Sequence, residues 1–67
     1  MNTIDARGLS CPEPVVMIHK AMQSREASYE ILVDNAAARE NVTRYAAHQG
    51  YQVAVTEKEG TYVLSIT

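Results

Sequence analysis

Hydrophobic and polar residues alternate in four short segments of this chain, which predicts four β-strands because successive side chains of a strand point to opposite faces. The segments are residues 1–6, 28–33, 51–56 and 62–66. Two longer segments, residues 12–24 and 36–49, place apolar residues three or four positions apart, the spacing of an amphipathic helix. The predicted order of elements is therefore β-α-β-α-β-β.

The residues between these segments are typical of turns and helix ends. Pro12 suits the first turn of a helix, where the backbone N–H groups have no intrahelical partner. Asp34 and Asn35 can cap the second helix, and Gly50 fits its C-terminal end. The polar residues 57–60 end in glycine and predict a hairpin turn between the last two strands.

The apolar faces of these elements can all be buried in an α+β fold, a two-layer sandwich in which two helices cover one face of a four-stranded mixed sheet. With 67 residues, the chain forms a single domain, residues 1–67. The uncovered face of the sheet is expected to be weakly apolar and could dock a partner. Its predicted residues are Leu32, Ala54, Val63 and Ser65.

Charge and composition exclude several classes of function. A net charge of −2, without a basic stripe, argues against direct nucleic-acid binding. The longest apolar run, residues 15–18, is far too short to span a membrane, and the N-terminus lacks the features of a signal peptide. The single cysteine cannot form an internal disulfide and suits a reducing compartment, so we expect a cytoplasmic location.

Unusual chemistry concentrates at one junction between loop and helix, around Cys11. A thiol at the start of a helix is exposed to free N–H donors and a partial positive charge, which stabilise the nucleophilic thiolate. Pro12 and Pro14 lack N–H groups and stiffen this segment, which leaves the Glu13 amide as the principal donor. Arg7 would lower the thiol pKa further and the Glu13 carboxylate would raise it. From these features alone, a nucleophilic Cys11 and a buried structural cysteine are about equally supported.

The other polar residues allow weaker interpretations. Asp5 either orients the loop through hydrogen bonds or simply points outward from the strand, and Gly8 serves a turn. His19 lies too far along the predicted helix to reach Cys11, and His48 lacks an orienting partner. We therefore expect both histidines to be solvated, and we expect no metal site and no cofactor. The basic helix residues are also expected to be solvated: Lys20, Arg25, Arg39 and Arg44.

Residues 5–14, Asp-Ala-Arg-Gly-Leu-Ser-Cys-Pro-Glu-Pro, together with Lys20-Ala21-Met22, resemble the TusA/SirA/YedF family of small sulfur carriers. Residues 33–42 and Gly50-Tyr51 are most similar to the YedF branch, which is associated with selenium metabolism and commonly carries a second, C-terminal domain. The resemblance covers essentially the whole chain and implies the same β-α-β-α-β-β sandwich.

The resemblance also implies a mechanism. Cys11 would accept sulfane sulfur as a persulfide from a cysteine desulfurase or a rhodanese-like donor, and would pass it to an acceptor protein, for example in tRNA thiolation or cofactor synthesis. The supporting residues of the motif would be Asp5, Arg7, Gly8, Pro12, Glu13 and Pro14. The alternative is a noncatalytic binding or regulatory module in which the Cys-Pro-x-Pro segment only caps the helix. In that case Cys11→Ser would behave like the wild type, because serine is a good N-cap.

Overall fold

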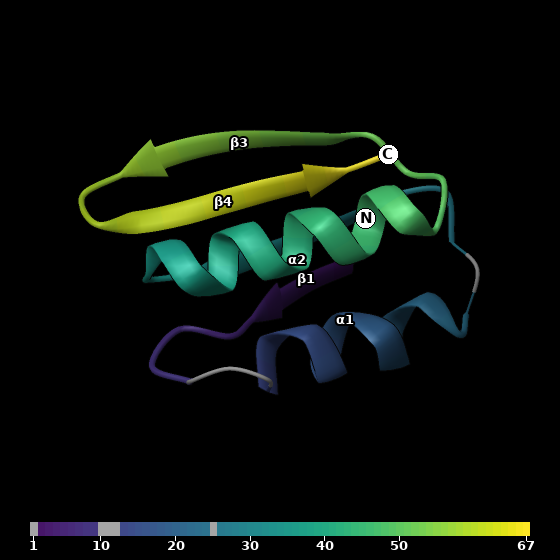
Figure 1. Ribbon diagram of the computed structural model, residues 1–67, viewed down its shortest axis with the longest axis horizontal. Coiled ribbons are helices and arrows are strands. Elements are labelled where there is room, and N and C mark those ends of the chain that lie inside the picture. The colour runs from purple at the N-terminus through teal and green to yellow at the C-terminus, as the bar shows by residue number, and fades with distance from the viewer. Residues whose placement is uncertain (1, 10–12, 25) are drawn as a thin grey trace.

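The computed structural model describes residues 2–9, 13–24 and 26–67, and it has the predicted order of elements (Figure 1). The four strands and two helices are β1 (Asn2–Asp5), α1 (Glu13–Met22), β2 (Tyr29–Val33), α2 (Ala36–His48), β3 (Val53–Lys58) and β4 (Thr61–Ile66). Among these described residues, neither helix is both long and apolar enough to cross a membrane.

The strands form one mixed sheet in the order β1-β2-β4-β3. β1 runs parallel to β2, with Asp5 opposite Leu32, and β4 is antiparallel to both of its neighbours. The last residues of β1 and β2 consequently lie at the same end of the sheet as the turn between β3 and β4. We call this end the hairpin end, and both helices also begin there (Figure 1).

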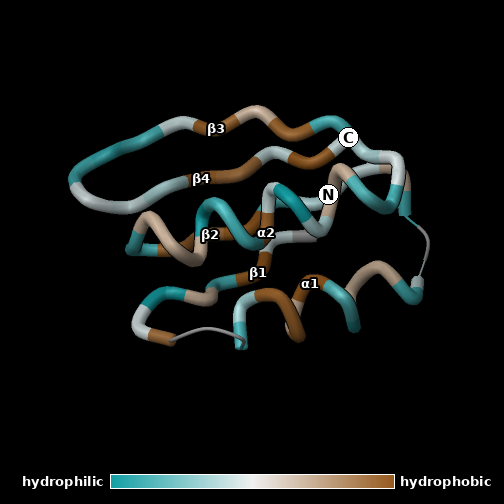
Figure 2. The backbone as a smooth tube through the Cα atoms, viewed as in Figure 1, coloured by the Kyte–Doolittle hydropathy of each residue, from teal (hydrophilic) through white to brown (hydrophobic). Residues whose placement is uncertain are grey.

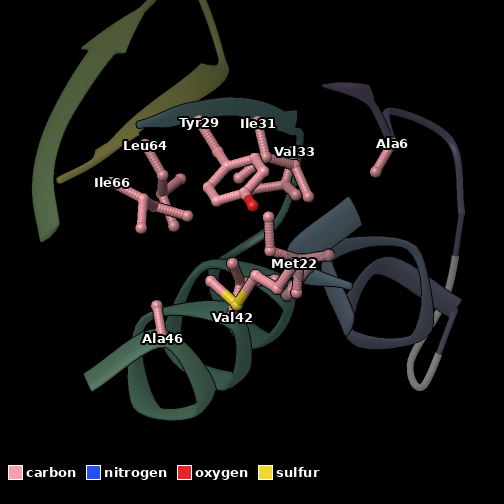
Figure 3. Packing of buried hydrophobic residues seen from close by; sticks show 11 residues of the cluster. Ala6, Met22, Tyr29, Ile31, Val33, Val42, Ala46, Leu64 and Ile66 are labelled. Atoms are coloured by element: carbon pink, nitrogen blue, oxygen red, sulfur yellow. The ribbon is translucent and has the colours of Figure 1, made fainter. Parts of the chain in front are cut away.

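Both helices cover the same face of the sheet, and the core lies between the two layers. Side chains of β2 and β4 point toward those of α1 and α2 (Figure 3). The fully or almost fully buried hydrophobic residues are Ala6, Ile18, Met22, Tyr29, Ile31, Val33, Ala38, Val42, Ala46, Leu64 and Ile66. The two-layer sandwich with two helices on one face of a four-stranded mixed sheet is therefore confirmed.

α1 buries the apolar stripe that its sequence predicts, formed by Pro14, Ile18 and Met22. It is shorter than predicted, because the backbone N–H groups of Gln23 and Ser24 bond to carbonyls only three residues earlier. Such bonds tighten the last turn of a helix and end it. The predicted first residue, Pro12, lies outside the described residues.

α2 has a defined cap at each end. Asn35 is extended, and its side-chain oxygen accepts a hydrogen bond of 2.8 Å from the Ala38 amide, which makes it the N-cap. At the other end, the Tyr51 amide donates to Ala46 and the Gly50 amide donates to Ala47. This pair of bonds is the Schellman arrangement, so the predicted helix end at Gly50 is confirmed.

The predicted boundary between the third strand and the hairpin turn is wrong. Glu57 and Lys58 belong to β3, where Lys58 pairs with Thr61, and the turn is only Glu59-Gly60. Both turn residues have positive φ, 52° and 81°, as a type I′ hairpin requires. The tip of this hairpin extends past the start of α2, and it is hydrophilic (Figures 1 and 2). Polar strand residues are tolerated there because solvent reaches both faces.

Candidate functional site

The loop that follows β1 begins with a tight turn at the hairpin end. The buried Ala6 continues the pairing with β2, since its amide donates to the Leu32 carbonyl at 2.9 Å. The Leu9 amide then donates back to the Ala6 carbonyl at 3.4 Å, which closes a four-residue turn. Gly8 is the third residue of that turn and has a φ of +79°, the value that a type II turn requires at this position. The predicted turn at Gly8 is confirmed.

Asp5 and Arg7 form a pair that fixes the first half of this turn. The Arg7 guanidinium donates to the two Asp5 carboxylate oxygens, from Nε at 2.9 Å and from Nη2 at 2.8 Å. The Arg7 backbone amide donates to Asp5 Oδ1 at 3.1 Å. These hydrogen bonds lower the pKa of the Asp5 carboxyl to about 2, the side-chain bonds having the larger effect, and the same pair raises the pKa of Arg7.

The Asp5–Arg7 pair shows that Asp5 orients the loop, and it also changes the role expected for the Arg7 charge. Asp5 is not merely an outward-pointing strand residue, because its carboxylate orients the chain two residues later. Arg7 is expected from the sequence to act as a second positive charge near the thiol. Its positive charge is instead offset by the paired Asp5 carboxylate. Both side chains are about half exposed.

A second carboxylate holds the turn from another strand. Asp34 follows β2 directly, and its Oδ2 accepts a hydrogen bond of 2.8 Å from the Gly8 amide. The sequence predicts Asp34 only as a helix cap, a role that Asn35 fills. No local pattern reveals the contact with Gly8, because 26 residues separate the partners and only the parallel pairing of β1 with β2 brings them together.

The remaining predicted site residues surround the start of α1. Glu13 is the first residue of the helix and is exposed, whereas Pro14 is fully buried. Cys11 and Pro12 lie outside the described residues. The described part of the predicted site is thus a turn fixed by hydrogen bonds on one side and the beginning of α1 on the other, with Cys11 in the chain between them.

Two residues predicted to be solvated have specific contacts. His19 is exposed, but its Nδ1 is hydrogen bonded to the Tyr45 hydroxyl and so links α1 to α2. Arg39 is partly buried, and its guanidinium lies 4.8 Å from the centre of the Tyr62 ring in a cation–π contact. The prediction is wrong for Arg39, because its partner Tyr62 lies on another element and is distant in the sequence. His19 is exposed as expected and has in addition a partner on α2.

The other basic residues and His48 are arranged more simply. Lys20, Arg44 and His48 are exposed, as expected, and Arg25 lies outside the described residues. Within the described ranges, no group of three or more histidine, cysteine, aspartate or glutamate side chains is arranged to hold a metal ion.

One known protein family matches almost the whole chain. The model of the family described as sulfurtransferase TusA matches residues 2–67. The chain belongs to the TusA family. The predicted TusA/SirA-like membership and the function of a sulfur carrier in sulfur relay are thereby confirmed.

Individual members of the TusA family are similar over most of the chain. The sulfur carrier protein TusA of Pseudomonas entomophila (strain L48) is 31% identical over 64 residues, covering 91% of this chain and 80% of that protein. The protein of the same name from Pseudomonas putida (strain W619) is 29% identical over 63 residues, covering 90% and 79%. The crystal structure of a SirA-like protein from Desulfitobacterium hafniense has a TM-score of 0.91 and 37% identity, covering 98% of this chain and 95% of that chain.

Proposed function

We propose that the protein carries sulfur as a persulfide on Cys11. The Cys11 thiolate attacks the terminal sulfur of a donor persulfide, a new S–S bond forms, and the donor leaves as its thiolate. In the second step, an acceptor nucleophile attacks the terminal sulfur on Cys11, and Cys11 leaves as a thiolate. Neither step is a net oxidation or reduction, because each S–S bond that breaks is replaced by a new bond to the transferred sulfur. The exchange therefore needs no external oxidant or reductant.

The observation that carries this proposal is the place of the single cysteine in the chain. Cys11 stands between a turn whose backbone is fixed by Asp5 and Asp34 and the first residue of α1, Glu13. The free N–H groups at a helix start favour a thiolate over a thiol. The exposed carboxylate of Glu13 opposes this effect, and a moderately activated thiol is expected.

The supporting residues of the motif have separable tasks in this proposal. Asp5, Arg7 and Gly8 shape the turn that leads to Cys11, and Pro12 and Pro14 restrict the backbone after it. The buried Pro14 anchors the beginning of α1 to the core. No cofactor is required by this chain, because both sulfur-transfer steps use only thiols and persulfides.

We infer that the partners are two proteins that dock in turn at the hairpin end. A cysteine desulfurase or a rhodanese-like protein would supply the sulfane sulfur, and a downstream acceptor would remove it. A cytoplasmic location fits this chemistry, since a single reactive thiol persists in a reducing compartment.

We also propose that the chain is closest to the YedF branch of the family. The support is the sequence of residues 33–42 together with Gly50-Tyr51. The cargo of that branch would be sulfur or selenium, and supplying a desulfurase with cysteine and selenocysteine in equal amounts distinguishes them by the mass of the atom that is added.

The test is the intact mass of the protein after incubation with a cysteine desulfurase and free cysteine. We expect the wild type to gain one sulfur atom that a reductant removes, and we expect both Cys11→Ser and Cys11→Ala to gain none. The serine variant keeps an N-cap and the alanine variant does not. An unmodified wild type, together with partner binding that survives in Cys11→Ser and weakens in Cys11→Ala, would favour the noncatalytic binding module.

A further inference from the structure

We propose that Asp34 is a positioning residue for sulfur transfer, because its carboxylate holds the Gly8 amide and thereby fixes the turn that precedes Cys11 in the chain. The inference rests on the proposed function of Cys11. Asp34, which lies just before α2 and 23 positions after Cys11 in the sequence, would then contribute to the reaction.

The geometry of the contact is specific. Asp34 Oδ2 accepts the Gly8 N–H at 2.8 Å, and Asp34 Oδ1 accepts a longer contact of 3.4 Å from the Asn35 side-chain amide. The contact with Asn35 is longer than an ordinary hydrogen bond, so the Gly8 amide is the principal partner of this carboxylate. A charge-assisted hydrogen bond from a backbone amide to a carboxylate is stronger than a neutral one.

The bond acts on the second half of the turn, beyond Ala6, whose amide already pairs with the Leu32 carbonyl of β2. The closing bond of the turn, from the Leu9 amide to the Ala6 carbonyl, is long at 3.4 Å. The contacts of Asp5 with Arg7 join residues only two positions apart, so they shape the turn without attaching it to the rest of the fold. Asp34 attaches the turn to the end of β2, and Gly8 is three residues before Cys11.

Asp34 influences the loop in two ways that substitutions can separate. Its carboxylate accepts the hydrogen bond, and its negative charge also acts on Arg7, whose pKa it helps to raise. Asparagine removes the charge and keeps a carbonyl acceptor of the same shape, whereas alanine removes both. A difference between Asp34→Asn and Asp34→Ala therefore reports the loss of the side-chain acceptor rather than the loss of the charge.

The experiment measures three properties of the full chain. They are the rate at which a cysteine desulfurase loads Cys11, the pH profile of alkylation of Cys11 by iodoacetamide, and the hydrogen exchange of the Gly8 amide. Asn35→Ala is the matched control, because it removes the N-cap of the same helix without removing the acceptor of Gly8. All rates are measured well below the unfolding midpoint of the least stable variant.

We expect Asp34→Ala to speed exchange of the Gly8 amide and to slow loading of Cys11 about three- to tenfold, the effect of losing one partly solvated charge-assisted bond. Asp34→Asn is expected to load within about twofold of the wild type. The alkylation profile of Asp34→Ala should differ from that of Asp34→Asn, although both lack the charge. Asn35→Ala should lower stability and leave loading and alkylation unchanged.

Three results would overturn the inference. They are wild-type loading in Asp34→Ala, equal slowing in Asp34→Asn and Asp34→Ala, or equal slowing in Asn35→Ala. Failure of the proposed function has a different signature, because the wild type itself would then acquire no sulfur on Cys11. In that event the alkylation profiles and the Gly8 exchange still decide whether Asp34 positions the loop.

Discussion

Arg7→Met removes the partner of the Asp5 carboxylate at the start of the candidate site, and its effect can be worked out from the structure. The guanidinium contacts of Arg7, at 2.8 and 2.9 Å, are the largest cause of the low Asp5 pKa of about 2. Without them, the pKa of Asp5 should rise toward its ordinary value of 3.8. At pH 3 the carboxyl would then be about nine-tenths ionised in the wild type and about one-seventh ionised in a fully relaxed variant.

The sign of the effect on stability follows from the same values. A carboxyl whose pKa is lower in the folded state stabilises the fold above its unfolded pKa and loses this contribution as the pH falls through the folded pKa. The contribution of Asp5 is thus complete at neutral pH and disappears between about pH 4 and pH 2. In Arg7→Met this dependence on pH should be smaller.

The assay is a titration of the Asp5 carboxyl carbon by NMR in the wild type, in Arg7→Met and in Arg44→Met. Arg44 is an exposed residue of α2 and serves as a matched loss of one positive charge. The reasoning is refuted if the wild-type Asp5 already titrates near 3.8, or if Arg44→Met raises its pKa as much as Arg7→Met does.

Two further predictions concern stability near the hairpin end. Glu59→Asn should raise the free energy of unfolding by about 0.5–1 kcal/mol and the midpoint by about 2–8 °C, because Glu59 has a φ of 52° and asparagine followed by Gly60 is preferred in a type I′ turn. A neutral or destabilising effect in thermal unfolding would contradict the two-residue turn. Asn35→Ala should lower the free energy of unfolding by about 1 kcal/mol, since the Ala38 amide loses its acceptor. Asn35→Ser should recover most of the loss in urea titrations, and no recovery would show that the side chain does not cap α2.

Most of the fold could be predicted from the sequence because burial on one face leaves a periodic signal. Ile18 and Met22 recur on one side of α1, and Ile31 and Val33 alternate in β2, so element type and layer order follow from the pattern. This periodic signal is absent where a strand is exposed to solvent on both faces. Residues 57–58 are polar and form part of a strand, because the edge strand β3 is solvent-exposed on both faces there.

The candidate site was predictable only in its local part. The motif around Cys11 and the turn at Gly8 can be recognised in consecutive residues. The bond from Asp34 to Gly8 cannot, since it depends on how β1 and β2 are placed side by side. The sequence also suggests a free positive charge on Arg7, whereas in the folded chain the local turn pairs its guanidinium with Asp5, two residues earlier.

Different interactions stabilise the fold and hold the turn that precedes Cys11. The core is formed by apolar side chains between the helices and the sheet, and the turn before Cys11 is held by two exposed carboxylates at strand ends. Burial of apolar surface provides most of the folding free energy of a domain, whereas exposed hydrogen bonds contribute little to it. Substituting Asp34 can therefore alter how Cys11 is presented with little loss of stability. A conservative change such as Ile18→Val should do the opposite, because Ile18 is fully buried in the core and makes none of the hydrogen bonds that hold the turn.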